Sequence, residues 1–327
     1  MFKTLMKPIK AIVILSAILS LTACSVFQPA PEKKAPLRIE FTDWWGDYTL
    51  IVAQKMGYFE KYGVEVESKY YPVFSKALPD LAAGQLDAGL FALGDALNVS
   101  RHAPLKVVTI YDNGGLNTIV STSDINSVAE VKGKRIGVPL GNAYELVIAE
   151  MLRNASMSTG DVTLVNALPE EIPARVGVDL DAGFTYEPYL SEAIANGNTI
   201  LYSSESVSGL FPDVIVFREQ FTQERPEDVR AFLSAWFEAV EYRHNFPDEA
   251  NKIIADYYGV AVKDILTNSD IQILSKTENL AMFSETNTLN LRPITATTEL
   301  NGNFLIRIGT LTKLPLFDQF LDPSFLY

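Results

Sequence analysis

The sequence has very few of the side chains that most often build catalytic and metal sites. Its 327 residues include one cysteine, Cys24, and two histidines, His102 and His244. A single cysteine excludes a disulfide framework and a zinc site made of cysteines. The histidines lie far apart in the sequence, so their spacing supports neither a metal site nor a Ser-His-Asp triad. We therefore expect no metal and no cofactor.

Positive charge is also scarce. The chain has 27 Lys and Arg residues against 40 Asp and Glu residues, a formal net charge of −13. Nucleic acid rewards Lys and Arg, so this acidity predicts no nucleic-acid partner. It fits a soluble extracytoplasmic protein and favours a neutral, zwitterionic or cationic ligand.

A short hydrophobic run opens the chain. Three lysines accompany an apolar run at 11–21, which ends in Leu21-Thr22-Ala23-Cys24. This is the pattern of a secretory signal, and a run of about 11 residues is too short for a bilayer span of roughly 20. The ending resembles the bacterial lipoprotein box, although an ordinary signal with an incidental cysteine is the alternative. We expect residues 1–23 to be a signal peptide and Cys24 to be lipidated, which moves the formal charge to −16.

The residues after Cys24 separate a tether from a globular part. Residues 24–36 hold three prolines and a charged run, which indicates a flexible tether. Beyond it, strand and helix patterns alternate, as in an α/β fold with mostly parallel sheets. Strands are expected at 37–41, 64–70, 105–110, 135–138, 162–165 and 214–217. Helices are expected over 48–56 with Asp47 as cap and Gly57 as stop, and after Asn142, Pro226 and Pro247.

Five motifs follow one another along the chain. They are Trp45-Gly46-Asp47-Tyr48, GYFEKYGVEVE at 57–67, GQLDA at 84–88, VKGKRIGV at 131–138 and DAGFTYEPY at 181–189. Each is weak alone, but the ordered set resembles the solute-binding proteins of bacterial ABC importers, in the nitrate/sulfonate/taurine and thiamine-pyrimidine-precursor branch. One departure is Val178, which stands where that family usually has a glycine; Gly177 is one residue early.

The resemblance implies a periplasmic-binding-protein type II fold. Two α/β lobes, with mixed sheets flanked by helices, would be joined by two crossing strands and would close on a ligand. We place lobe one at 37–120 plus 215–327 and lobe two at 121–214. The implied partners are a small-molecule ligand, the ABC permease and, through the lipid, the membrane. The protein is expected to be a monomer in the periplasm or on the extracellular face.

Ligands of open α/β sheets sit beyond the carboxyl ends of strands, and this rule nominates four loops. In the first, Asp43, Trp44, Trp45 and Tyr48 offer stacking surfaces and a carboxylate, and we expect one of the two tryptophans in the cleft and the other buried. In the second, Asp95 either caps the helix that follows or turns to the ligand.

The third and fourth loops come from lobe two. Gly141 and Asn142 precede a helix N-terminus, a ready anion site, but Asn142 and Glu145 have the spacing of a capping box that would weaken it. In the fourth loop Pro188 favours an extended Glu187, whose carboxylate, beside Tyr186, either lines the cleft or bonds another loop.

The charges near these loops are almost all negative. The acids are Asp43, Asp47, Asp95, Glu145, Glu187 and Asp213, whereas the nearest bases, Arg218 and Arg175, fall in none of the four loops. An anion site normally needs Arg, Lys or several free backbone donors. The hypothesis is therefore an amine or nitrogen heterocycle held by an aromatic face and a carboxylate.

Three other functions remain open at this stage. A ligand-presenting sensor lipoprotein would have the same sequence features, and a purely structural lipoprotein would need no closing cleft. A pyrimidine-synthesising relative shares the implied fold and depends on a cysteine-rich segment and a histidine. Here the one cysteine is assigned to the lipid and His102 has no partner at metal spacing, so an enzyme is not expected.

Overall fold

Ten strands in the described part of the chain form two five-stranded sheets. The first sheet has the order β2-β1-β3-β10-β4, and the second has the order β7-β6-β8-β5-β9. The strands are β1 (Leu37–Phe41), β2 (Val66–Tyr70), β3 (Ala88–Ala92), β4 (Leu105–Asp112), β5 (Thr118–Ser121), β6 (Arg135–Val138), β7 (Thr163–Asn166), β8 (Ala182–Thr185), β9 (Thr199–Ser203) and β10 (Asp213–Arg218).

A computed structural model describes residues 34–114, 117–203, 211–265, 271–284 and 292–327. The expected signal peptide, Cys24 and almost all of the expected tether lie outside these residues.

Both sheets are mixed. In the first, β1 runs parallel to β2 and β3, whereas β10 runs antiparallel to β3 and β4. In the second, β6 runs parallel to β7 and β8, whereas β5 runs antiparallel to β8 and β9. The chain enters the second sheet after β4 and returns to the first at β10. The expected α/β class with two mixed sheets is confirmed, and the lobe boundaries stay a prediction.

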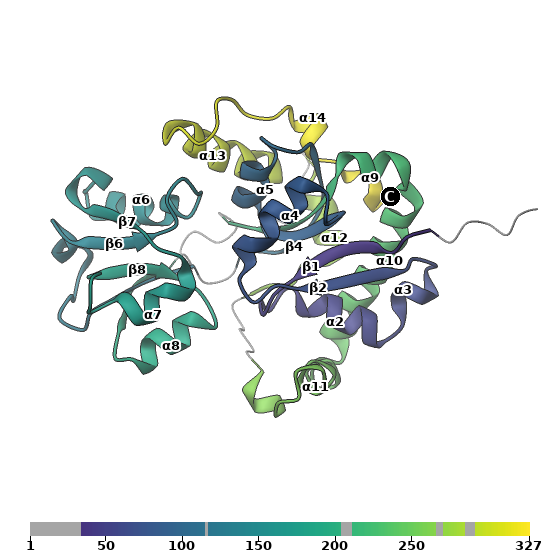
Figure 1. Cartoon of the computed structure of the whole chain (residues 1–327), viewed down its shortest axis with the longest axis horizontal. Helices are drawn as coiled ribbons and strands as arrows, with labels where there is room; N and C mark the ends of the chain where they lie inside the picture. The colour runs from purple at the N-terminus through teal and green to yellow at the C-terminus, as the bar shows by residue number, and fades with distance from the viewer. Residues whose placement is uncertain (1–33, 115–116, 204–210, 266–270, 285–291) are drawn as a thin grey trace, which may run out of the picture. The chain divides into compact units, whose positions relative to one another are not determined.

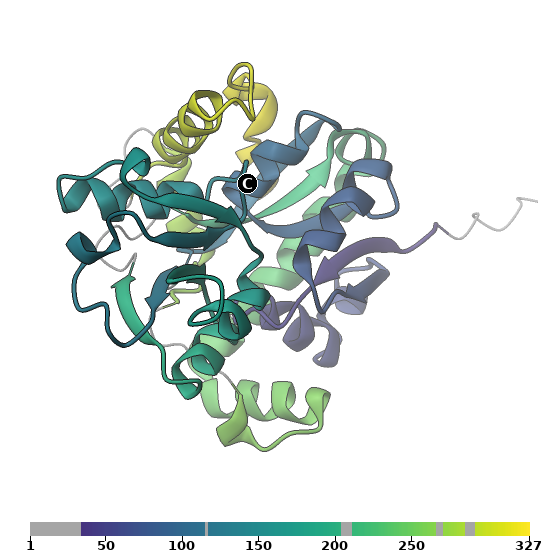
Figure 2. The ribbon, with the colours of Figure 1, turned by 60° about the vertical axis from the view of Figure 1, so that its left-hand side comes forward.

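Helices flank both sheets (Figure 1). Around the second sheet, in teal in Figures 1 and 2, lie α6 (Glu145–Asn154), α7 (Ile172–Arg175) and α8 (Tyr189–Ala195). The others are α2 (Tyr48–Lys55), α3 (Tyr58–Lys61), α4 (Ala77–Ala83), α5 (Leu93–Val99), α9 (Glu219–Glu224), α10 (Pro226–Asn245), α11 (Pro247–Tyr258), α12 (Lys276–Met282), α13 (Ile294–Arg307) and α14 (Phe317–Phe320). None of the helices in the described ranges combines the length and the apolar character that crossing a membrane requires.

The long helix α10 shows how local sequence sets these elements. Pro226 occupies its first turn with Glu227 and Asp228, where acids complement the helix dipole, and Arg243 lies in its last turn. The expected stripe of Val229, Phe232, Leu233, Trp236, Phe237 and Val240 is buried. These side chains belong to one hydrophobic cluster with β1 and α2. A second cluster combines side chains of both sheets, such as Val107 and Ile136.

Two expected helix starts are formed differently from the sequence prediction. Asp47 precedes α2 but makes no capping bond; its carboxylate instead accepts from Thr42, which tightens the turn after β1. Helix α6 begins at Glu145, and the Asn142–Glu145 pair is not the expected capping box. The Asn142 side chain accepts from the Tyr144 N–H, while Glu145 accepts from the Gly141 N–H at 2.6 Å.

The turn with the unusual Val178 is formed without a glycine at that position. Gly177 adopts the left-handed conformation, with φ of +89°, and Val178 is 83% exposed. The early glycine therefore provides the turn that leads back into β8.

Candidate functional site

A pocket lies at the carboxyl ends of strands from both sheets. It encloses about 500 Å³ of space not occupied by atoms, part of it open to solvent. Its lining comprises Thr42, Trp44, Asp47, Phe74, Leu90, Phe91, Ala92, Tyr111, Gly114, Asn117, Tyr144, Tyr186, Phe211 and Asp213. Thr42 follows β1, Gly114 follows β4 and Tyr186 follows β8, so the pocket occupies the edge that the fold rule nominated.

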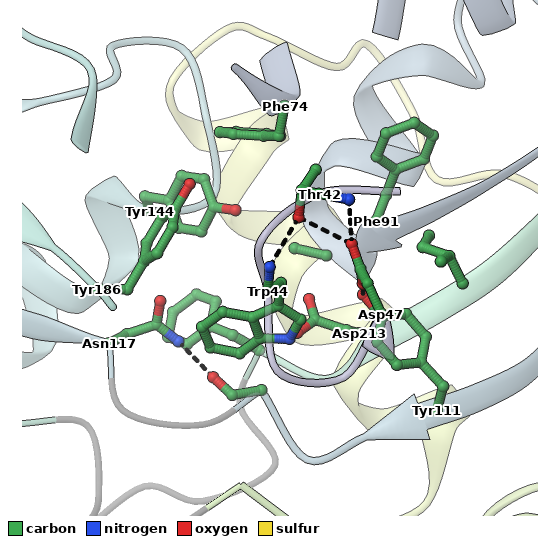
Figure 3. A pocket seen from close by; sticks show the side chains of 14 residues that line it. Thr42, Trp44, Asp47, Phe74, Phe91, Tyr111, Asn117, Tyr144, Tyr186 and Asp213 are labelled. Carbon is green, nitrogen blue, oxygen red and sulfur yellow. Dashed lines mark hydrogen bonds between the residues drawn. The ribbon is translucent and has the colours of Figure 1, made fainter. Parts of the chain in front are cut away.

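Aromatic rings form much of the wall (Figure 3). The ring of Trp44 meets that of Tyr186 edge to face at 5.7 Å, and Phe74 meets the same tyrosine at 6.4 Å. Trp44 follows β1 of the first sheet, whereas Tyr186 follows β8 of the second. The aromatic surface is therefore assembled from segments that follow strands of both sheets.

Asp47 is a buried carboxylate at the floor of this pocket. It accepts from Thr42 N and Thr42 Oγ1 at 2.8 Å each, and from the Tyr111 hydroxyl at 3.0 Å. Burial nevertheless raises the pKa of Asp47 to about 7, because these bonds only partly replace its lost hydration. Its acceptor sites are used by the protein. Asp47 therefore contributes to the pocket mainly through its negative potential and not as a free hydrogen-bond acceptor.

Asp112 and Asp213 form the other acidic feature. The Trp44 indole donates to Asp112 Oδ2 at 2.7 Å, and Gly114 N donates to Asp112 Oδ1 at 2.7 Å. Asp213 lies directly opposite Asp112 in the β4–β10 register, and their carboxyl groups are hydrogen-bonded. The bond from the Trp44 indole to Asp112 links the pocket tryptophan to the end of β4.

Arg243 is a buried cation that was not predicted from the sequence. It is buried on α10, donates to Thr49 Oγ1 at 2.6 Å and Trp45 O at 3.2 Å, and stacks over the Trp45 ring at 4.5 Å. Burial lowers its pKa to about 10, while Asp112, Tyr48 and Asp47 favour its charge. Arg243 is not among the lining residues. The signal for its role in the sequence is its place in the last turn of α10, where a basic side chain favours carbonyl partners.

The first nominated loop divides between the pocket and the protein interior. Trp44 lines the pocket, whereas Trp45 packs edge to face on Tyr48 at 5.7 Å and is partly buried. Tyr48 is buried in the hydrophobic cluster that includes residues of β1 and α10, and Asp43 accepts from the Tyr70 hydroxyl at 2.6 Å. Of these four residues, only Trp44 lines the pocket.

The second and third loops meet each other. Asp95 makes no capping bond on α5; it accepts from Asn142 Nδ2 at 2.6 Å and from the Tyr144 hydroxyl at 3.0 Å. Burial raises the pKa of Asp95 to about 6. Thr310 donates to the Gly141 carbonyl at 2.9 Å. Asp95, Gly141 and Asn142 therefore hold neighbouring segments together and are absent from the pocket lining, whereas Tyr144, just before α6, lines it.

The fourth loop places Tyr186 in the pocket wall and Glu187 outside it. The Glu187 carboxylate accepts from the backbone and hydroxyl of Ser191, at 3.1 and 3.0 Å, in the first turn of α8. This is the structural role that the sequence left open as the alternative to a ligand contact.

The lining residues include neither lysine, arginine nor histidine in the described part of the chain. Arg175 pairs with Asp179 at 2.8 Å, and Arg218 packs against Gly84. Within the described ranges no three His, Cys, Asp or Glu side chains gather as metal ligands would.

Comparisons with known proteins agree with this architecture. The family model described as NMT1/THI5 like matches residues 47–250, more than half of the chain. A Bacillus subtilis (strain 168) protein, provisionally named an aliphatic sulfonates-binding protein, is 27% identical over 281 residues, covering 82% of each chain. A Haemophilus influenzae protein, provisionally named a thiamine biosynthesis protein, is 26% identical over 66% of this chain and 71% of its own.

A solved structure shows the same fold. The alkanesulfonate-binding protein SsuA of Xanthomonas axonopodis pv. citri, bound to MOPS, superposes with a TM-score of 0.69. It is 18% identical, and the match covers 89% of this chain and 99% of that one. The chain therefore belongs to the NMT1/THI5-like family and has the fold of periplasmic solute-binding proteins.

Proposed function

We propose that this chain is the solute-binding component of an ABC importer and that its pocket binds a small molecule carrying a protonated amine or a nitrogen heterocycle. The protein would be anchored to the membrane by lipid at Cys24, on the periplasmic or extracellular side. It would deliver its ligand to a permease and make or break no covalent bond. The family and fold support the importer role, and the pocket supports the ligand class.

The composition of the pocket wall carries the ligand proposal. Asp47 and Asp213 are its acidic residues, and its rings include Trp44, Tyr186 and Phe74. Aromatic faces and carboxylates attract cations, and their combination is a common way to bind an ammonium group or a flat nitrogen ring. An alkanesulfonate or nitrate, which is an anion, would be repelled by the negative potential of these carboxylates.

Three backbone donors around the pocket are also engaged. Thr42 N donates to Asp47, and Trp44 N donates to Thr42 Oγ1 at 3.1 Å. Gly114 N donates to Asp112. An oxyanion needs several such donors when no Arg or Lys is present. In this proposal, the relatives named for sulfonates therefore support the importer role but not the class of ligand.

A thermal-shift screen tests the ligand class. We expect benzylamine or 4-aminopyrimidine to raise the melting temperature, and methanesulfonate and nitrate to leave it unchanged, because binding to the native state alone stabilises it. Phe74→Ala should reduce the shift, whereas Phe246→Ala, at a half-exposed ring that is not part of the lining, should keep it. Stabilisation by sulfonate or nitrate with no response to the amines would contradict the proposal.

The anchor has a separate test. Metabolic labelling with palmitate should mark the full chain, and Cys24→Ser should abolish the label and move the protein from the membrane to the soluble fraction. A wild-type chain that is secreted without label would contradict the anchoring and leave the binding role intact.

A further inference from the structure

Asp112 and Asp213 are two carboxyl groups that share a hydrogen bond at the pocket wall. They are paired across β4 and β10, and each side chain bonds the other. Two ionised carboxylates offer only acceptors, so this bond requires that one of them carries a proton. Buried carboxyl pairs hold such a proton because both charges cannot be stabilised at once.

The hydrogen bonds assign the proton to Asp213. Asp112 already accepts from Trp44 Nε1 and from Gly114 N, one donor at each oxygen. These donors favour its ionised form. Asp213 then donates to it, and burial together with the negative charge of Asp112 raises the pKa of Asp213 well above its ordinary value.

Only Asp213 of this pair is a lining residue. Its side chain lies beside the Trp44 indole in Figure 3, and it is 9% exposed. The carboxyl group that carries the proton is therefore the one that a ligand in the pocket would touch.

The groups around the pair come from several elements. Titratable groups that influence Asp213 or the pair are Asp47 before α2, Asp95 on α5, Tyr111 on β4, Tyr144 before α6, Tyr186 after β8 and Arg243 on α10. Tyr111 and Tyr144 are buried and Tyr186 is partly buried, and the pKa values of all three are raised, so they stay neutral. Arg243 faces Asp112 and Asp47 and balances part of their charge. Among the acids, Asp47 accepts three hydrogen bonds and donates none.

We propose that Asp213 holds the shared proton in the ligand-free pocket and releases it to water when a cationic ligand binds. The ligand ammonium then binds the Asp213 carboxylate from the pocket side. This inference rests on the cationic ligand class proposed above. It makes Asp213 the residue that distinguishes a cationic ligand from a neutral molecule of the same shape.

Proton release links affinity to pH. Below the pKa of Asp213 each cation must displace one proton, so affinity rises as the pH rises, by about tenfold per pH unit. The effect should appear at every pH that lies below the pKa of Asp213 and at which an alkylamine stays protonated. A neutral ligand leaves the proton in place and should show no such slope.

The shared proton can be observed without any ligand. Infrared difference spectra of the wild-type protein minus Asp213→Asn at neutral pH should show a carbonyl band of a protonated carboxylic acid. Asparagine preserves the shape and can donate to Asp112, so the variant should fold. Glu40→Gln is the matched control: Glu40 is fully buried on β1, has a raised pKa and is not part of the lining, so its own band should be lost with no change in the Asp213 band. Absence of the Asp213 band would overturn the assignment.

Calorimetry with benzylamine in two buffers of different ionisation enthalpy tests the release. We expect close to one proton released per benzylamine bound, none with benzyl alcohol, and none with benzylamine in Asp213→Asn. That variant should also bind benzylamine at least about tenfold more weakly, because a charge-assisted bond is lost. Binding without proton release, or release that persists in Asp213→Asn, would overturn the inference but not the ligand class. Failure of benzylamine and 4-aminopyrimidine to bind a protein that shows the band would instead contradict the ligand class.

Discussion

Asn142 donates its side-chain amide to Asp95 at 2.6 Å, and this bond connects the segment before α6 to helix α5. The Tyr144 hydroxyl donates to the same carboxyl group at 3.0 Å. Asp95 is fully buried, and Tyr144 also lines the pocket. Elements that flank the two different sheets are thus joined by a buried acid next to the candidate site.

Replacing Asn142 by alanine should destabilise the protein. The substitution removes one of the two donors to a buried carboxyl group, which costs about 1.5–3 kcal/mol in the free energy of unfolding. Denaturant titration measures the loss. Asn126→Ala is the control, because its exposed side chain donates only to the nearby Asp124 carbonyl and should matter little. Equal free energies of unfolding of both variants would show that the Asn142–Asp95 bond does not stabilise the protein.

Asp95 should make stability depend on pH. Its pKa is raised from 3.8 to about 6 in the folded protein, because burial disfavours the charge. The folded state therefore retains a proton that the unfolded chain releases, and this contribution to stability is full below about pH 4 and is lost as the pH rises through about 6. Over that window the wild type should lose about 3 kcal/mol more than Asp95→Asn. Parallel curves for the two proteins would contradict this assignment.

Trp44 should report ligand binding by fluorescence. It lines the pocket, whereas Trp236 is fully buried and Trp45 packs on Arg243. The compound with the largest thermal shift should change the emission of the wild type and of Trp45→Phe, but not that of Trp44→Phe. Trp44→Phe should also weaken binding by about tenfold through the lost indole face. A response that disappears in Trp45→Phe instead would place the ligand elsewhere.

Gly46 should tolerate no side chain. A Cβ there would overlap the carboxyl group of Asp112 and the ring of Tyr111. Gly46→Ala is expected to destabilise the fold by about 1–3 kcal/mol through overpacking, and to weaken ligand binding because Asp112 must move. Gly160→Ala is the matched control, since its nearest neighbour would lie at an ordinary 3.5 Å. Unchanged melting temperature in Gly46→Ala would contradict the close packing at this turn.

Six of the ten described strands were predicted from the sequence because their patterns are local, whereas β3, β5, β8 and β9 were not predicted. Strand β6 and helix α10 begin where the sequence placed them, since alternating apolar residues and a first-turn proline act over short distances. Asp47 shows the limit of such patterns. Its carboxylate has the capping position, but the Thr42 donors and the Tyr111 hydroxyl compete for it, and the second of these is 64 residues away.

The candidate site was predictable only in part. Trp44 and Tyr186 follow strands in nominated loops and line the pocket, whereas Glu187 follows a strand too and is held by Ser191. The direction of the side chain decides whether such a residue lines the pocket, and its position in the sequence does not reveal that direction. Asp112 and Arg243 were not predicted as site residues, because their partners, Asp213 and Trp45, are distant in the chain.

Native mass spectrometry of the protein purified from the cells that naturally make it tests the central claim most directly. We expect one small molecule per chain, which fragmentation identifies as an amine or a nitrogen heterocycle and which Asp213→Asn retains poorly. A sulfonate or nitrate carried in its place would contradict the account of an acidic, aromatic pocket that selects a cation.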